Sequence, residues 1–297
     1  ASLPGPYGIG DFGKPAYHFV DFLEASGQKN WQILPLGVTS YGDSPYQCLS
    51  AFAGNPYFID LKTFIELGYL SKIEVAKAKL DKESNPIDYG HLFKAKIGLL
   101  KKAYKRARLN LEDVLADYMK EREDWLRPFA LYMAIKSDQG HRAWSEWVPE
   151  YRDYTSPEVK AFEAAHKEDI HFWVFTQYFF EMQWQKLKHY ANQKGVRIIG
   201  DLPIYVAEDS ADVWAKPAYF MLGKNHKPLK ISGCPPDAYS ITGQLWGNPI
   251  YNWRQMKKDG YQWWIERFRH SYTLYDVMRI DHFRGFEAYW EVKYGAE

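Results

Sequence analysis

The chain has 297 residues, of which 46% are hydrophobic and 25% are charged, a composition typical of a globular protein with a buried core. Its net charge of +1 gives no general attraction for nucleic acid or for an anionic membrane surface, so neither is expected as a partner. Aromatic residues reach 18%, an excess that we interpret as a sign of a neutral ligand that stacks on rings.

The two cysteines, Cys48 and Cys234, form neither a disulfide framework nor a Cys-x-x-Cys metal site, and they favour a reducing compartment. The sequence contains no run of 18 apolar residues, which argues against a membrane span. The first residues lack the basic and apolar regions of a signal peptide. They also lack an initiator Met, so we expect that a segment upstream has been removed.

The first predicted helix begins at Lys14-Pro15, because Pro favours the first turn of a helix, and it ends at Gly27. A strand is predicted directly after it, over 31–36. The surrounding segment, 1–61, holds only seven charged residues and many turn signals, as expected for loops around a site. Its Gly-x-Gly-x-x-Gly match, 8–13, follows no strand and is interpreted as a plain loop.

Residues 62–127 carry twenty-six charged side chains of both signs, a pattern that favours helices with solvated faces over a nucleic-acid surface. Beyond them a second helix (168–193) precedes a buried strand (196–201), and a third helix (260–274) precedes a strand over 277–283. Helices that alternate with strands predict a parallel sheet. A barrel is favoured over a doubly wound sheet, because no phosphate-binding loop is found.

Charged residues stand near the carboxyl ends of two predicted strands. Asp201 ends the second strand, and in the third Arg279 and Asp281 are two residues apart and therefore share one face. A guanidinium beside a carboxylate favours the ionised form, which a carboxylate nucleophile or electrostatic stabiliser needs. A purely structural ion pair at the strand end is the alternative.

Metal binding is not expected from the clusters of polar residues. Four carboxylates between 201 and 212 lack the Asp-x-Asp-x-Asp-Gly pattern of a calcium loop, and Asp209 or Ser210 is predicted to cap a short helix instead. His166 and His171 do not have the i, i+4 spacing of a helical zinc pair.

Two segments rich in Gly and Pro, 41–47 and 233–249, carry aromatic, amide and carboxylate side chains of the kind that contact sugars. Each aromatic taken singly is more typical of a core, but several on turn-rich segments beside carboxylates favour a binding surface. The candidate substrate contacts in these two segments are Asp43, Tyr46, Tyr239, Trp246 and Asn248.

Five segments in this order are informative as a set. They are 2–10, Ser-Pro-Tyr-Gln at 44–47, 200–207, Trp-Gly-Asn-Pro at 246–249, and Arg-Ile-Asp-His-Phe-Arg-Gly at 279–285. Together they resemble glycoside hydrolase family 77, the 4-α-glucanotransferases or amylomaltases, over nearly the whole chain.

The resemblance implies an α/β fold, a (β/α)8 TIM barrel of the α-amylase clan that is incomplete in this chain and has a helical insertion subdomain. Residues 1–61 would begin the catalytic barrel and 62–165 would form the insertion. Residues 166–297 would continue the barrel, with a long active-site loop excursion at about 205–258. The enzyme would be cytoplasmic, would act in starch and glycogen metabolism and would need no cofactor.

The implied reaction moves α-1,4-glucan segments between maltooligosaccharides by retaining double displacement, through a covalent glycosyl-enzyme. Asp281 would be the nucleophile and Arg279 its ionising partner. Asp201 and His282 would bind the hydroxyls of the donor sugar, and Tyr46 would stack on it.

Transfer instead of hydrolysis requires that an acceptor sugar outcompetes water. By resemblance, Trp246 and Asn248 would belong to the loop over the acceptor side. We expect a lid that includes Tyr239 and Trp246 to exclude water from the intermediate.

One family feature is absent. Retaining chemistry needs a second carboxylate about 5 Å from the nucleophile, and the family's Glu-Asp-Leu-Gly segment does not occur after Asp281. Glu287, Glu291 and Glu297 lie outside any such motif. We therefore expect this chain to be an N-terminal part of the enzyme and to be inactive alone. An α-glucan hydrolase and a non-catalytic α-glucan-binding protein are the alternatives.

Overall fold

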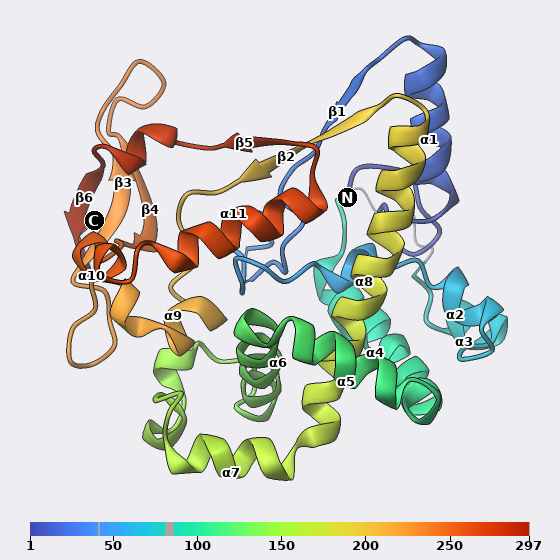
Figure 1. Cartoon of the computed structure of the whole chain (residues 1–297), viewed down its shortest axis with the longest axis horizontal. Helices are drawn as coiled ribbons and strands as arrows, with labels where there is room; N and C mark the ends of the chain where they lie inside the picture. The colour runs from blue at the N-terminus through green and yellow to red at the C-terminus, as the bar shows by residue number, and fades with distance from the viewer. Residues whose placement is uncertain (41, 81–85, 297) are drawn as a thin grey trace.

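The computed structural model describes residues 1–40, 42–80 and 86–296, and it has a mixed α/β fold (Figure 1). The helices are α1 (Lys14–Ala25), α2 (Lys62–Glu66), α3 (Lys72–Lys77), α4 (Tyr89–Ala107), α5 (Glu112–Glu121), α6 (Glu123–Asp138), α7 (Pro157–Ala165), α8 (Lys167–Gln193), α9 (Ala211–Ala215), α10 (Trp253–Lys258) and α11 (Gln262–Leu274). The strands are β1 (Asn30–Gln32), β2 (Arg197–Leu202), β3 (Lys230–Cys234), β4 (Gln244–Pro249), β5 (Val277–Ile280) and β6 (Trp290–Lys293).

The three predicted helix–strand units are confirmed. The strands β1, β2 and β5 form one parallel sheet in the order β1-β2-β5, and each is preceded by its helix, α1, α8 or α11. The helix α8 contacts both α1 and β2, while α11 contacts β2 and β5. Parallel strands separated by helices carry their carboxyl ends to the same edge of the sheet, which is where Asp201 and Arg279 lie.

Two predicted strands were too long. The first is a strand only over Asn30–Gln32, although the amide of Ile33 still donates to Ile199 O at 3.0 Å. Pro35 has no amide hydrogen and cannot continue such a ladder. The third ends at Ile280, because His282 adopts φ 50° and turns the chain into a short 3-10 helix, Phe283–Phe286.

The excursion predicted at about 205–258 contains regular structure. It holds α9, α10 and the antiparallel pair of β3 and β4, and β6 adds to β3 on the other side. The chain passes from the end of β5 through the short 3-10 helix to β6, so this second sheet stands at the carboxyl end of β5 (Figure 1). The loop between β3 and β4 projects from the molecule in the same view.

The helices α2 to α7 gather on one side of the parallel sheet (Figure 1). The 27-residue helix α8 joins the two parts, since it contacts α4, α5, α6 and α7 as well as β2. Its aromatic residues form part of the core, where Phe64 stacks against Phe175 with ring centroids 5.6 Å apart. Many of the aromatic residues that make up the excess in the sequence therefore serve to pack the core.

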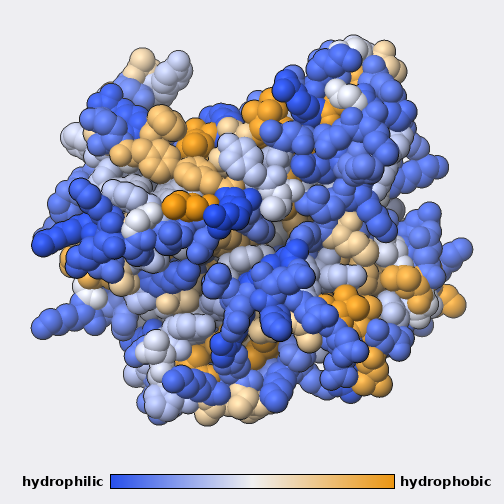
Figure 2. All heavy atoms as spheres, in the orientation of Figure 1, coloured by the Kyte–Doolittle hydropathy of each residue, from blue (hydrophilic) through white to orange (hydrophobic). Residues whose placement is uncertain are grey.

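None of the helices in the described part of the chain is long and apolar enough to cross a membrane. Figure 2 shows that the visible face is largely hydrophilic and that its upper edge is hollowed. In the same orientation β5 runs along that edge, between the β3–β4 hairpin and the end of the molecule that holds α1 (Figure 1).

A glycine permits close packing at the centre of the sheet. A Cβ atom at Gly200, next to Asp201, would lie 2.2 Å from the ring of Tyr275, which is buried. Non-bonded atoms cannot approach so closely, so any side chain at this position must push the ring or the strand away.

We therefore predict that Gly200→Ala lowers the free energy of unfolding by about 3 kcal/mol, the upper end of the usual cost of overpacking a core. Gly98→Ala is the matched control, since a Cβ there has no neighbour within 4 Å and Gly98 lies inside α4. The control is expected to raise stability by about 0.5–1 kcal/mol. Urea unfolding measures both, and equal stabilities of the two variants would contradict the packing described.

Candidate active site

The register of the parallel sheet brings two charged side chains together. Asp201 of β2 pairs directly with Arg279 of β5, so both point to the same face of the sheet. The Nη1 atom of Arg279 donates to Oδ1 of Asp201 at 2.6 Å. Asp201 is only 3% exposed, and a buried carboxylate of this kind needs such a partner.

The same guanidinium reaches a second carboxylate. Its Nη2 atom donates to Oδ1 of Asp281 at 2.8 Å. Asp281 lies one residue beyond the end of β5, yet its amide donates to Leu202 O at 3.1 Å and thus continues the strand pairing. The expectation that Arg279 and Asp281 share a face is confirmed, although Asp281 is not itself in the strand.

Tyr46 binds the other side of the buried carboxylate. Its hydroxyl donates to Oδ2 of Asp201 at 2.7 Å. Burial, together with this hydrogen bond, raises the pKa of Tyr46 to about 12, so the phenol remains a neutral donor near neutral pH. The loop that carries Tyr46 is thereby attached to β2 across 155 residues of sequence.

The three charged groups form a graded line from the core to solvent. The side chain of Asp201 is 2% exposed, whereas those of Arg279 and Asp281 are 46% and 43% exposed. The hydrogen bond to Asp201 and the attraction of both carboxylates raise the pKa of Arg279, so the guanidinium stays charged. The arrangement holds one carboxylate rigidly and leaves the other, Asp281, open to a ligand.

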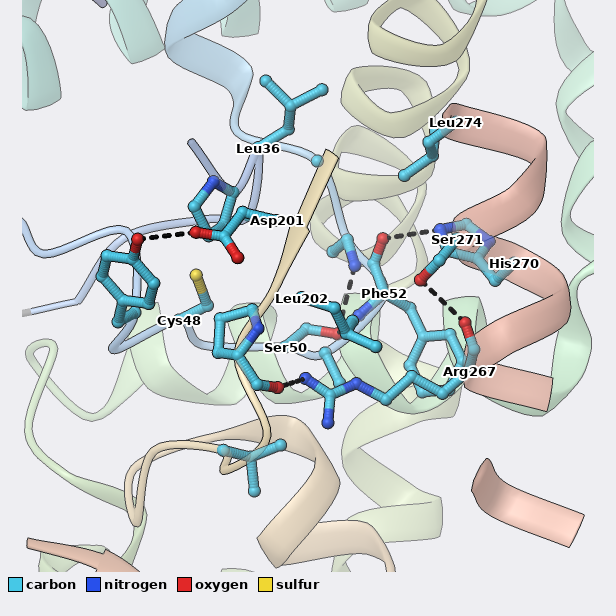
Figure 3. A pocket seen from close by; sticks show the side chains of 18 of the residues that line it. Leu36, Cys48, Ser50, Phe52, Asp201, Leu202, Arg267, His270, Ser271 and Leu274 are labelled. Atoms are coloured by element: carbon cyan, nitrogen blue, oxygen red, sulfur yellow. Dashed lines mark hydrogen bonds between the residues drawn. The ribbon is translucent and has the colours of Figure 1, made fainter. Parts of the chain in front are cut away.

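A small cavity of about 50 Å³ lies behind Asp201, between the segment after β1, β2 and α11 (Figure 3). Its size suits a few water molecules and not a sugar. The buried Arg267 of α11 crosses the wall of the cavity and donates to Pro203 O at 2.6 Å and to Ile204 O at 3.1 Å. Arg267 therefore fixes the backbone directly after Asp201.

An aromatic cluster borders the exposed end of the line. The ring of Trp246 meets that of His282 edge to face, with centroids 5.0 Å apart, and Tyr205 contacts both rings. Within the described residues, Nε2 of His282 and the hydroxyl of Tyr205 are buried without a hydrogen-bond partner. His282 directly follows Asp281 in the chain, and Tyr205 contacts the ring of His282, so both unpartnered atoms lie beside the exposed end of the site.

The other predicted substrate contacts do not lie at the exposed end of the site beside Asp281. Asn248 is 5% exposed, and its amide is hydrogen-bonded to Gln47 and Val206. Tyr239 is 96% exposed in the loop between β3 and β4 and does not cover Asp281 in this structure. Asp43 lines another cavity, of about 360 Å³, and burial raises its pKa. Tyr41 of the same loop and Glu297 lie outside the described residues.

Two polar residues with a structural role at the site were not predicted. Arg267 follows Trp263 and Trp264 at helical spacing, so a charged residue on the apolar stripe of α11 was the available signal. Gln47 was part of a recognised segment but received no role, because its partner Asn248 is 201 residues away.

The carboxylates after Asp201 are engaged by protein groups. Asp209 accepts hydrogen bonds from Tyr132 and Lys136, and the amide of Ala51 donates to Asp212. Among the residues that the structure describes, no group of three or more His, Cys, Asp or Glu side chains is arranged to hold a metal ion. Ser210 caps α9, as predicted, by accepting from Val213 N at 3.3 Å.

Comparisons with known proteins give one consistent result. A family model described as 4-alpha-glucanotransferase matches residues 1–297. The chain is 50% identical to a 4-alpha-glucanotransferase of Clostridium butyricum, over 99% of this chain and 61% of the relative, and 44% identical to one of Thermus thermophilus, over 98% and 58%. It thus spans about three-fifths of the length of the curated relatives that it matches.

Solved structures agree. The amylomaltase of Streptococcus agalactiae in complex with acarbose superimposes with a TM-score of 0.94 at 44% identity, covering 100% of this chain and 60% of that one. The amylomaltase of Corynebacterium glutamicum has a TM-score of 0.77 at 20% identity, over 99% of this chain and 41% of that one, which shows a shared fold.

The ion pair between Asp201 and Arg279 leads to a prediction about stability. Arg279→Met leaves the buried carboxylate of Asp201 without its cation, and we expect the free energy of unfolding at pH 7 to fall by about 1–2 kcal/mol. This loss is smaller than for a fully buried pair because the guanidinium is half exposed. The double variant Asp201→Asn/Arg279→Met should recover part of it, since no unpaired charge remains.

Arg284→Met is the control, because Arg284 is an exposed arginine just beyond Asp281. Urea unfolding compares the variants. If Arg279→Met had the same free energy of unfolding as Arg284→Met, the ion pair between Arg279 and Asp201 would not stabilise the fold.

Proposed function

The chain belongs to the 4-alpha-glucanotransferase family, glycoside hydrolase family 77, and on this premise we propose that it carries the nucleophile and donor side of a site that transfers α-1,4-glucan segments. The observation that carries the proposal is Asp281, a half-exposed carboxylate bound on one side by Arg279. A carboxylate oriented by a guanidinium on one side, with its other side open, is suited to attack an anomeric carbon.

The proposed reaction has two displacements. Asp281 attacks the anomeric carbon of the donor glucan, the glycosidic bond breaks, and the departing oxygen receives a proton from a general acid. The 4-hydroxyl of an acceptor sugar then displaces Asp281 and loses its proton to the same group, now a base. The anomeric configuration is retained, because it is inverted twice.

Asp201, Tyr46 and His282 are proposed to bind the donor sugar. Asp201 already accepts from Tyr46 and Arg279, but an ionised carboxylate has about four acceptor positions, which leaves room for sugar hydroxyls. The unpartnered Nε2 of His282 offers a further polar contact. In keeping with the family, α-1,4-glucans and maltooligosaccharides are the proposed substrates.

On the acceptor side we propose Trp246 and, when the loop between β3 and β4 closes, Tyr239. Trp246 stands beside His282, whereas Tyr239 is exposed and would have to move inward to exclude water. Asp43, on a different cavity, is proposed as a contact for a more distant part of a glucan chain.

The acid–base carboxylate is proposed to lie outside residues 1–297. The family motif that carries it, Glu-Asp-Leu-Gly, does not occur after Asp281, and Glu287 and Glu291 stand in other contexts. Residues 1–297 alone would then bind glucan without turning it over.

The wider architecture is proposed from the same resemblance. The strands β1, β2 and β5 would be part of a (β/α)8 barrel that residues 1–61 begin and 166–297 continue, with 62–165 as a helical insertion. Both Cys48 and Cys234 are free thiols, which supports a reducing, cytoplasmic location.

The product of the complete gene, incubated with maltotriose, should release glucose together with maltopentaose and longer oligosaccharides. Asp281→Asn preserves the size of the side chain but removes the nucleophile, so kcat should fall at least about a thousandfold. The exposed Glu287→Gln is the matched control and should retain activity.

Other outcomes decide against parts of the proposal. Persistent turnover by Asp281→Asn would remove Asp281 from the nucleophile role. Glucose without longer products would indicate a hydrolase, and glucan binding without turnover would indicate a binding protein. Disproportionation by residues 1–297 alone would place the acid–base group within this sequence.

A further inference from the structure

Two carboxamide side chains join the donor-side loop to β4. Gln47 Nε2 donates to Asn248 Oδ1 at 3.3 Å, and Asn248 Nδ2 donates to Gln47 Oε1 at 3.2 Å. We call these two residues the amide pair. A reciprocal arrangement of this kind satisfies a donor and an acceptor of both groups at once.

The amide pair also binds the backbone on both sides of the site. Gln47 Nε2 donates to Trp246 O at 3.2 Å, and Asn248 Nδ2 donates to Val206 O at 2.9 Å. Val206 follows Asp201 on the chain, and Trp246 is the aromatic residue beside His282. Three segments that are remote in sequence are therefore held at one point.

The backbone of β4 needs this support where it is irregular. The pairing of β3 with β4 shifts register between Ile231 and Gly233, so that Ile231 faces Pro249 while Gly233 faces Leu245. Gly247, within the shifted part, has φ 80°. Regular ladder bonding is interrupted at such a bulge, and the carbonyl of Trp246 receives its hydrogen bond from Gln47 instead.

The sequence neighbours of the pair are the proposed sugar contacts. Tyr46, next to Gln47, is fixed on Asp201 at 2.7 Å, and Trp246 lies two residues before Asn248. Asn248 itself is 5% exposed, and its oxygen also receives a hydrogen bond from the buried Ser232 at 3.5 Å. Its polar atoms are thus engaged by protein groups in this structure.

We propose that the amide pair is a positioning device that fixes the donor-side residue Tyr46 and the acceptor-side residue Trp246 relative to each other across Asp281. The inference rests on the proposed function, in which an acceptor sugar must reach the glycosyl-enzyme before water. A displaced Trp246 weakens acceptor binding, so water captures more of the intermediate, whereas donor cleavage depends mainly on Asp281 and its ion pair.

The test compares Gln47→Leu, Gln47→Glu and the control Gln28→Leu in the product of the complete gene with maltotriose. Gln28 is an exposed glutamine between α1 and β1. Gln47→Glu keeps the size of the side chain and one acceptor oxygen but removes both Nε2 donations, which covers the case in which Gln47→Leu does not fold. For each variant, donor consumption, transfer products and newly formed reducing ends are measured together.

Both Gln47 variants should lower the ratio of transfer to hydrolysis about tenfold and raise the KM for acceptor, the size expected for losing one or two hydrogen bonds, with a smaller change in kcat for donor cleavage. The double variant Gln47→Leu/Asn248→Leu should lose less than the sum of the losses in the single variants Gln47→Leu and Asn248→Leu, because the two residues share their mutual hydrogen bonds. A ratio equal to that of the control, or a parallel loss of cleavage and transfer, would overturn the inference.

Amide hydrogen exchange provides a second readout that does not depend on activity. In Gln47→Glu, peptides covering 42–47 and 244–249 should both exchange faster than in Gln28→Leu. Unchanged exchange over 244–249 would show that the pair does not hold β4. If the unsubstituted protein gave no glucan products at all, the proposed function would fail, and the exchange result would still decide the role of the pair.

Discussion

The buried carboxylate of Asp201 is the constraint on which the rest of the site depends. A charge with 3% exposure is costly without a cation and hydrogen bonds, and the parallel pairing of β2 with β5 supplies Arg279 directly opposite. Because side chains alternate along an extended chain, the same guanidinium meets Asp281 two residues later. Structural stability and the placement of the proposed nucleophile therefore have one physical origin.

The surrounding segments contact Asp201, Arg279, Asp281 and their neighbours at several points. Tyr46 binds Asp201 from the loop after β1, and Gln47 joins that loop to β4. Arg267 of α11 holds the backbone that leaves β2, and the rings of Trp246 and His282 pack at the exposed end. Each contact joins residues that are distant in sequence, so the site exists only when both sheets and α11 are assembled.

Local patterns predicted the parts of this arrangement that depend on local physics. Helical periodicity and the Pro and Gly signals located α1, α8 and α11, and strand alternation placed Arg279 and Asp281 on one face. The antiparallel sheet of β3, β4 and β6 was missed, because all three strands are short and both β3 and β4 contain Gly, with Pro249 in β4 as well. The amide pair could not be found, since residues 47 and 248 meet only through tertiary packing.

Trapping the covalent intermediate tests the role of Asp281 most directly. The product of the complete gene is incubated briefly with a maltosyl fluoride that carries an additional ring fluorine to slow breakdown of the glycosyl-enzyme, and its peptides are then mapped by mass spectrometry. We predict one maltosyl adduct on the peptide that contains Asp281, with none in Asp281→Asn. An adduct on a different carboxylate, or donor consumption without any adduct on this peptide, would contradict the assignment of Asp281 as the nucleophile.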